Sequence, residues 1–172
     1  WNIMSEAGYG RVVVATSGAG LYGNFGQANY GAAKTAMLGL MNVLHHEGAK
    51  NNIRVNTLAP TAATRMLDGL FPEQIASLMG PELVTPGVLY LVSEDAPSKT
   101  ILGAGAGCFS VVHVYETPAV FLGGAGATVD DVAANWAKIT STEGEAGLDG
   151  AFGQTGKFAA AAAAALGVEL KG

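Results

Sequence analysis

Three residues close together in the chain carry side chains that suit proton transfer to or from an oxygen atom: Ser17, Tyr30 and Lys34. Tyr30 and Lys34 are four positions apart, so on a helix they share one face and the ammonium group stabilises the phenolate anion. A phenol beside a fixed cation suits general acid/base catalysis, and a nearby serine hydroxyl would orient the substrate oxygen. The alternative interpretation is a solvated Tyr30–Lys34 pair and a Ser17 that only caps a loop.

The segments around these residues predict a strand, a helix and a second strand. Residues 10–17 form a short apolar, β-branched run between turn residues, which is typical of a strand buried on both faces. Residues 27–48 carry small and apolar residues at helical spacing and end at a glycine, which predicts a long helix. Residues 53–58 predict the second strand, which we expect Pro60 to end. This order predicts parallel strands joined by a right-handed crossover, with Ser17 at the carboxyl end of the first, where such sheets bind ligands.

The rest of the chain predicts further α/β structure. The expected elements are a third strand over residues 107–115, helices opened by Pro72 and Pro81, a helix capped by Thr128, and a terminal helix over residues 155–170. We therefore expect the later part of a doubly wound parallel sheet. It would form a single partial domain over residues 1–172, in which residues 1–115 carry the site and residues 116–172 are a C-terminal extension.

A glycine-rich motif follows the first predicted strand. Gly18, Gly20 and Gly23 match the G-x-G-x-x-G pattern of a dinucleotide phosphate loop. Such a loop needs a helix that opens directly at the third glycine and an acidic residue at the end of the next strand. Neither condition holds, and 25 glycines make chance matches frequent. We interpret the motif as a coincidence.

Composition and charge exclude several classes of partner and site. A net charge of −5 without Lys/Arg clusters argues against nucleic acid and anionic membranes, and we expect no transmembrane segment. The single cysteine, Cys108, excludes an internal disulfide and favours a reducing, cytoplasmic compartment. Adjacent His45 and His46 point in different directions and His113 lacks spaced partners, so we expect no metal site. Only 13% of residues are charged, which indicates that part of the surface packs against other protein.

Ser17, the Tyr30-x-x-x-Lys34 spacing and the stretch RVNTLAP after the helix resemble the catalytic, C-terminal part of the short-chain dehydrogenase/reductase family. More narrowly, YGNFGQANYGAAKTAMLGLMNVL, NIRVNTLAP and VDDVAANWAKI resemble the (3R)-hydroxyacyl-CoA dehydrogenase domains of type 2 multifunctional enzymes and their bacterial relatives. The resemblance is dense from Gly8 to Glu94 and patchy to Ile139. It implies a Rossmann-type sheet.

The resemblance also implies an activity in lipid metabolism: hydride transfer between NAD or NADP and a hydroxyl or carbonyl group, with a 3-hydroxyacyl or 3-oxoacyl thioester as the expected substrate. Tyr30 would be the general acid/base, Lys34 would hold the nicotinamide ribose, and Ser17 would position the substrate oxygen within a loop over residues 17–23. The cofactor-binding residues would be Tyr30, Lys34, Pro60, Thr61, Ala63 and Thr64. Thr61 departs from the family, which usually has glycine there.

The residues that would hold the rest of the cofactor are not found in this sequence. It has no glycine-rich first turn, no residue that selects NAD over NADP and no upstream catalytic asparagine, so we expect the N-terminal nucleotide-binding part to be missing. In the family, the long helix packs in dimer interfaces, which implies a homodimer or tetramer, or association with the missing part. Two alternatives stay open: a reductase of carrier-protein thioesters or of steroids and ketones, and a non-catalytic fragment or subunit that lacks the cofactor half.

Overall fold

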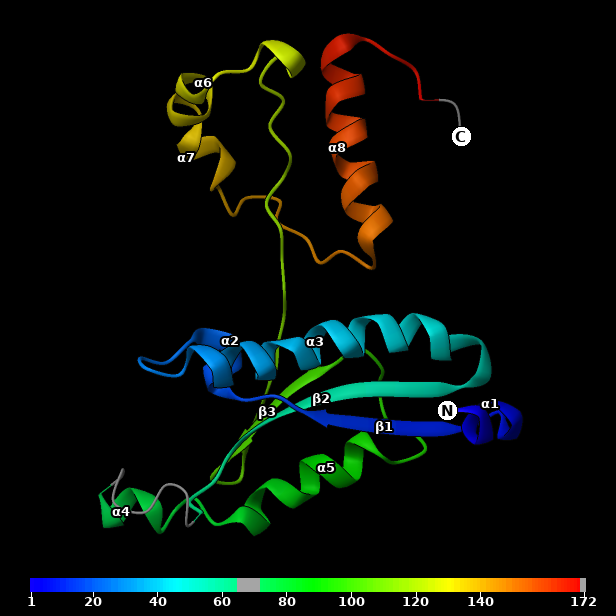
Figure 1. Ribbon diagram of the computed structural model, residues 1–172, viewed down its shortest axis with the longest axis vertical. Coiled ribbons are helices and arrows are strands. Elements are labelled where there is room, and N and C mark those ends of the chain that lie inside the picture. Colours follow the sequence, from blue (N-terminus) through cyan, green and yellow to red (C-terminus); the bar gives the residue numbers. More distant parts are fainter. Residues whose placement is uncertain (65–71, 171–172) are drawn as a thin grey trace. The chain divides into compact units, whose positions relative to one another are not determined.

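The computed structural model describes residues 1–64 and 72–170. The chain divides into two compact units, Trp1–Val112 and His113–Gly172, and each is described by itself (Figure 1). That both belong to one partial domain, with residues 116–172 as an extension, stays a prediction.

Unit 1 is built on a four-stranded sheet in the order β1-β2-β3-β4. The strands are β1 (Gly10–Ala15), β2 (Ile53–Thr61), β3 (Ile101–Gly105) and β4 (Cys108–Val112). The pairs β1–β2 and β2–β3 are parallel, whereas β3–β4 is antiparallel. The predicted α/β fold with a mostly parallel sheet is confirmed.

The third strand differs from the prediction. The strand expected at residues 107–115 is β4, an antiparallel edge strand, and the parallel neighbour of β2 is β3, which the sequence analysis missed. The two glycines of β3 conceal the strand, because glycine normally weakens one. Here they fit close contacts: a Cβ on Gly105 would lie 2.7 Å from the Thr61 carbonyl oxygen, and one on Gly103 would lie 3.0 Å from Ser110 Oγ.

The strand β2 continues through Pro60 to Thr61, so the expectation that Pro60 ends it is wrong. The Thr16 amide donates a hydrogen bond to the Leu58 carbonyl, 2.8 Å away, so the backbone of Leu58 faces β1. Since backbone groups two residues apart point to the same side of a strand, Pro60 also faces that side. Strand β1 has already ended at Ala15, so the backbone N–H that proline lacks is not needed for hydrogen bonds between β1 and β2.

The long helix expected over residues 27–48 is confirmed as α3 (Ala28–Gly48). A short helix, α2 (Gly18–Tyr22), stands where a loop over residues 17–23 was expected. Ser17 marks the start of this helix, because its side chain caps the N-terminus of α2. The remaining helical segments among the described residues of unit 1 are α1 (Asn2–Ala7), η1 (Ala49–Asn51), α4 (Glu73–Ala76), η3 (Pro81–Val84) and α5 (Thr85–Leu91).

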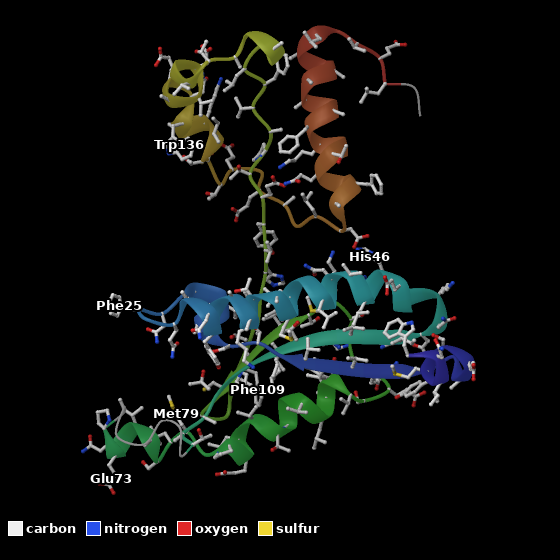
Figure 2. All side chains as sticks on the ribbon, viewed as in Figure 1. Phe25, His46, Glu73, Met79, Phe109 and Trp136 are labelled. Atoms are coloured by element: carbon white, nitrogen blue, oxygen red, sulfur yellow. The ribbon has the colours of Figure 1, made fainter. Side chains whose placement is uncertain are left out.

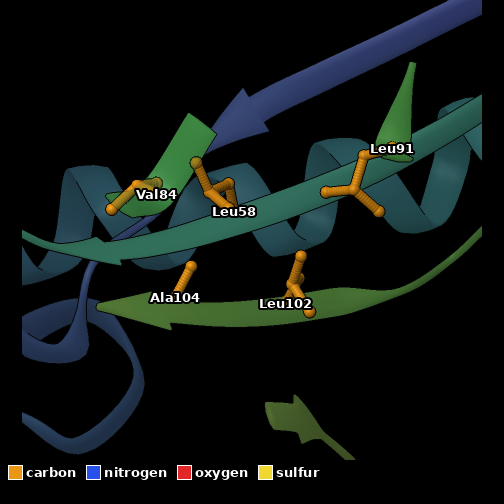
Figure 3. Close-up of a cluster of buried hydrophobic side chains, with 5 residues drawn as sticks. All are labelled: Leu58, Val84, Leu91, Leu102 and Ala104. Carbon is orange, nitrogen blue, oxygen red and sulfur yellow. The ribbon is translucent and has the colours of Figure 1, made fainter. Parts of the chain in front are cut away.

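Helices cover both faces of the sheet in unit 1, with α2 and α3 on one side and α5 on the other (Figure 1). Residues of β2 alternate between the two sides. On the α3 side, Met41 packs with Ile53, Val55 and Ile101. On the other side, the core cluster contains Leu58, Val84, Leu91, Leu102 and Ala104 (Figure 3).

Unit 2 contains the helical segments η4 (Gly124–Gly126), α6 (Val129–Ala134), α7 (Trp136–Ile139) and α8 (Ala151–Leu166). Thr128 caps α6 as predicted, in a capping box with Asp131. A single antiparallel bridge joins Glu116 to Ala146. Across the described parts of both units, no helix is long and apolar enough to cross a membrane.

Candidate active site

Ser17 lies at the junction between β1 and α2, half-buried. Its hydroxyl oxygen accepts a hydrogen bond from the Ala19 amide at 3.2 Å, which caps the short helix. A serine hydroxyl has one donor and two acceptor positions. Capping occupies one acceptor position, and the hydroxyl keeps its proton for donation to a ligand oxygen.

The Lys34 side chain is held at the carboxyl end of β1. Its Nζ donates a hydrogen bond to the carbonyl oxygen of Ala15, the last residue of β1, at 3.1 Å. The side chain is half-buried against the sheet. The ammonium group therefore lies at the carboxyl end of β1, two residues before Ser17 in the chain.

Tyr30 lies one helical turn before Lys34 on α3. The Lys34 Nζ is 5.8 Å from the centroid of the Tyr30 ring, so the two side chains share a face as their spacing requires. Tyr30 keeps 39% of its surface exposed, which leaves the ring open to a ligand. The structure thus brings the tyrosine, the lysine and the serine-bearing turn to one end of the sheet, at the carboxyl end of β1.

The residues predicted to contact a nicotinamide follow the adjacent strand. Pro60 and Thr61 end β2, and Ala63 and Thr64 lie in the segment that follows it. The Ala63 amide donates to the Met79 carbonyl at 2.7 Å, which ties this segment to the α4 region (Met79 is labelled in Figure 2). Because β1 and β2 are parallel, this segment and Ser17 leave the sheet at the same edge.

The hydrogen-bond donors at the carboxyl ends of β1 and β2 suit one half of a dinucleotide. The Lys34 ammonium and the exposed hydroxyls of Thr61 and Thr64 are groups that bind ribose hydroxyls and a carboxamide. Strand β1 is an outer strand of the sheet, so no described strand lies beyond it to hold a pyrophosphate. The residues present therefore fit the nicotinamide end of the cofactor.

A metal centre finds no support among the described side chains. Within residues 1–64 and 72–170, no three His, Cys, Asp or Glu side chains are grouped so that they could hold an ion. His45 Nδ1 instead lies 2.8 Å from Ser98 Oγ. His113 stacks on Tyr115 with ring centroids 5.5 Å apart.

Two residues that contact the Lys34 turn, Thr16 and Gly20, are not predicted as site residues from the sequence. By its pattern alone, Thr16 belongs to the end of a strand and Gly20 to the G-x-G-x-x-G match. Their positions immediately before Ser17 and three residues after it were the available signal.

Comparison with known proteins identifies the region that holds these residues. Residues 1–74 match the family model described as short chain dehydrogenase. A short-chain type dehydrogenase/reductase of Mycobacterium tuberculosis is 46% identical over 151 residues, which are 84% of this chain and 50% of that protein. An acetoacetyl-CoA reductase of an Acinetobacter species is more distant, 40% identical over 110 residues, 58% of this chain and 44% of that protein.

A comparison of folds finds a similar solved structure that covers residues of both units. The solved structure of full-length peroxisomal multifunctional enzyme type 2 from Drosophila melanogaster matches with a TM-score of 0.83 and 29% identity. The match covers 96% of this chain and 30% of that one. The chain therefore spans half the length, or less, of these relatives.

Proposed function

We propose that this chain, which belongs to the short-chain dehydrogenase/reductase family, supplies the catalytic part of an NAD(P)-dependent oxidoreductase acting on a hydroxyl or carbonyl group. One observation carries the proposal. The Lys34 ammonium is fixed at the end of β1, on the Tyr30 face of α3 and beside the Ser17 turn. This is the arrangement that proton transfer to one substrate oxygen requires.

In the reduction direction, the Ser17 hydroxyl donates a hydrogen bond to the substrate carbonyl and orients it. The Tyr30 phenol transfers its proton to that oxygen, and the Lys34 ammonium stabilises the phenolate left behind. In the oxidation direction, the phenolate takes the proton of the substrate hydroxyl. A bound nicotinamide supplies or accepts the hydride.

For the substrate we propose a 3-hydroxyacyl or 3-oxoacyl thioester. The flanks of Tyr30 and Lys34 resemble hydroxyacyl-CoA dehydrogenase domains, and one relative is named for reducing acetoacetyl-CoA, a 3-oxoacyl thioester. The expected cytoplasmic location stays a prediction, since a structural relative is named as peroxisomal.

The unpaired side of β1 indicates where a further part of the nucleotide-binding site could join the sheet. The apolar strand β1 is paired only on its β2 side among the described strands, and an unpaired strand edge is a template for another strand. We propose that strands from an N-terminal part pair there and hold the pyrophosphate. A homodimer or tetramer through the small residues of α3, such as Ala32, Ala36 and Gly39, stays a prediction.

The test combines binding with turnover. Isothermal titration of the chain with NADH and with NADPH is followed by absorbance assays of acetoacetyl-CoA reduction. We expect Tyr30→Phe to lower turnover about 10²-fold or more, because the proton donor is gone. Tyr90→Phe, a change at a 54% exposed tyrosine of α5, is the matched control.

A second candidate function is a subunit or fragment that carries the proton-transfer residues without the cofactor half. Two observations favour it: the chain covers only 50% of its M. tuberculosis relative, and β1 is an outer strand among the described strands. Silence toward both nucleotides, with no turnover, would support this second function. Turnover that survives Tyr30→Phe would contradict the assigned role of Tyr30.

A further inference from the structure

The residues on either side of Ser17 are both anchored to the helical turn that carries Lys34. Resting on the proposed function, in which Ser17 and Lys34 act at one substrate, we propose that Thr16 and Gly20 are positioning residues that fix the Ser17 turn against Lys34. The Thr16 hydroxyl is used on the Lys34 main-chain carbonyl, and Gly20 has no side chain, so neither residue acts on the reacting atoms directly. Their effect would pass through the placement of the two functional groups.

Thr16 links three segments and is 1% exposed. Its amide donates to the Leu58 carbonyl on β2, and its Oγ1 donates to the main-chain carbonyl of Lys34 at 2.8 Å. The preceding carbonyl, of Ala15, accepts the hydrogen bond from Lys34 Nζ. The end of β1 therefore holds Lys34 at both its backbone and its ammonium group.

Gly20 makes the second anchor, where α2 crosses α3. A Cβ on Gly20 would lie 2.7 Å from Lys34 Cβ and 3.0 Å from both the Lys34 carbonyl carbon and the Thr35 nitrogen. These atoms belong to the helix backbone and its first side-chain carbon, so they cannot swing away. The Thr35 hydroxyl closes the contact by donating to the Gly20 carbonyl. The crossing is thus as close as glycine alone permits.

Ser17 lies between these two anchors. Because Thr16 and Gly20 both rest on the Lys34–Thr35 turn, the serine hydroxyl cannot move relative to the lysine unless one anchor yields. A displacement of about 1 Å in a catalytic group is enough to lower a rate about 10²-fold. The glycine that resembles part of a phosphate loop therefore has a different purpose: close packing of the serine turn on the catalytic helix.

The first experiment observes Lys34 directly in the chain. Two-dimensional ¹⁵N NMR at low temperature detects lysine ammonium groups whose hydrogen bonds slow their exchange with water, and Lys34→Arg assigns the signal. We expect Gly20→Ala to shift or abolish the Lys34 signal. The Lys157 signal, from an ammonium held 3.0 Å from Glu116 Oε2 in unit 2, is the internal reference and should persist.

Gly18→Ala is the matched control, because it lies in the same short helix and its Cβ would meet no heavy atom within 4 Å. It should leave the Lys34 signal in place. A Gly20→Ala protein that folds and keeps the parent Lys34 signal would overturn the proposal.

Thr16→Val and Thr16→Ser test the proposal without Gly20→Ala, in case that variant does not fold. Valine keeps the shape of threonine but cannot donate to the Lys34 carbonyl, whereas serine can. We expect the Lys34 signal to weaken in Thr16→Val and to return in Thr16→Ser. Equal signals in the two variants would contradict the role of Thr16.

Turnover adds a readout that a purely structural role would not move. In a preparation active with acetoacetyl-CoA, we expect Gly20→Ala to lower kcat roughly tenfold or more with KM little changed. An unchanged kcat would overturn the positioning role. A parent chain that shows the Lys34 signals but no turnover would count against the proposed function, while the anchoring of Lys34 would stand on the spectra.

Discussion

The two units of the chain are stabilised in different ways. Of the buried hydrophobic residues in the described parts of the chain, all but Ala163 belong to unit 1. Unit 1 also ties distant segments together by buried polar contacts, such as the Asn56 amide that bonds to Pro97 and Thr100. The residues proposed to transfer the proton lie on this unit, which is packed on both faces of its sheet.

Among the described residues, unit 2 contributes one buried hydrophobic residue, Ala163, and it is tied together by polar contacts. Large apolar side chains are exposed in both units, such as Phe152 in unit 2 (89%) and Phe25 in unit 1. Lys157 contacts both Glu116 Oε2 at 3.0 Å and the Thr117 carbonyl at 2.9 Å, and Gln154 donates to the other Glu116 oxygen at 2.9 Å. The packed core and the proposed site residues therefore lie on the same unit. This contrast between the units predicts different sensitivities to mutation and pH.

The largest expected effect is in the core of unit 1. Leu91, 1% exposed, packs against Leu58 and Leu102, so Leu91→Ala should lower the free energy of unfolding by about 3 kcal/mol. Leu166→Ala, at a 63% exposed position of α8, should cost less than about 0.5 kcal/mol. Urea unfolding followed by tryptophan fluorescence checks both values.

The two tryptophans allow each unit to be followed separately. Trp1 lies in unit 1 and Trp136 in unit 2, so Trp136→Phe and Trp1→Phe backgrounds report one unit each. Equal losses in Leu91→Ala and Leu166→Ala would remove the contrast between the units.

A smaller effect is expected from the buried polar link of unit 1. Asn56 is fully buried; its Nδ2 donates to the Pro97 carbonyl at 2.7 Å and its Oδ1 accepts from the Thr100 amide at 3.1 Å. Asn56→Ala would leave these two backbone groups without their side-chain partner, so we expect a loss of about 2 kcal/mol. Denaturant unfolding in the Trp136→Phe background measures it.

The control for this substitution is Asn42→Ala at an exposed position of α3. It should change the free energy of unfolding by no more than about 0.5 kcal/mol. If Asn56→Ala matched it, the contacts of Asn56 would contribute little to the stability of unit 1.

The sequence predicts those parts of unit 1 whose residues act locally. The apolar run of β1, the helical spacing of α3 and the order of strand, helix and strand follow from periodicity. The serine, tyrosine and lysine were selected by type and spacing, and α3 places Tyr30 and Lys34 on one face. Periodicity predicts these features because each depends on neighbours within one or two turns.

The sequence does not predict features that depend on contacts between segments. Strand β3 was missed because Gly103 and Gly105 are selected by their neighbours, Ser110 and Thr61, rather than by strand propensity. The close contact between Gly20 and Lys34 is hidden for the same reason. A single glycine gives no local sign of what packs against it.

The smallest expected effect is the pH dependence of unit 2. Hydrogen bonds from Gln154 and Lys157 lower the pKa of Glu116 below its usual value of 4.5. A carboxylate with a lowered pKa in the folded state contributes its stabilisation fully above the usual value, and the contribution is lost as the pH falls through the lowered one. The Trp136 transition should therefore weaken below about pH 4.5, while Glu116→Gln should remove this part of the dependence.

Glu143→Gln is the matched control, since it removes an exposed carboxylate of the same unit. It should leave the acid dependence of the Trp136 transition as in the parent chain. The Trp1 transition tests the comparison itself, because unit 1 is held by apolar packing and should not respond to Glu116→Gln. If both transitions shifted together with Glu116→Gln, the two units would be unfolding as one, and the contrast between a unit with a packed core and a unit linked by polar contacts would fail.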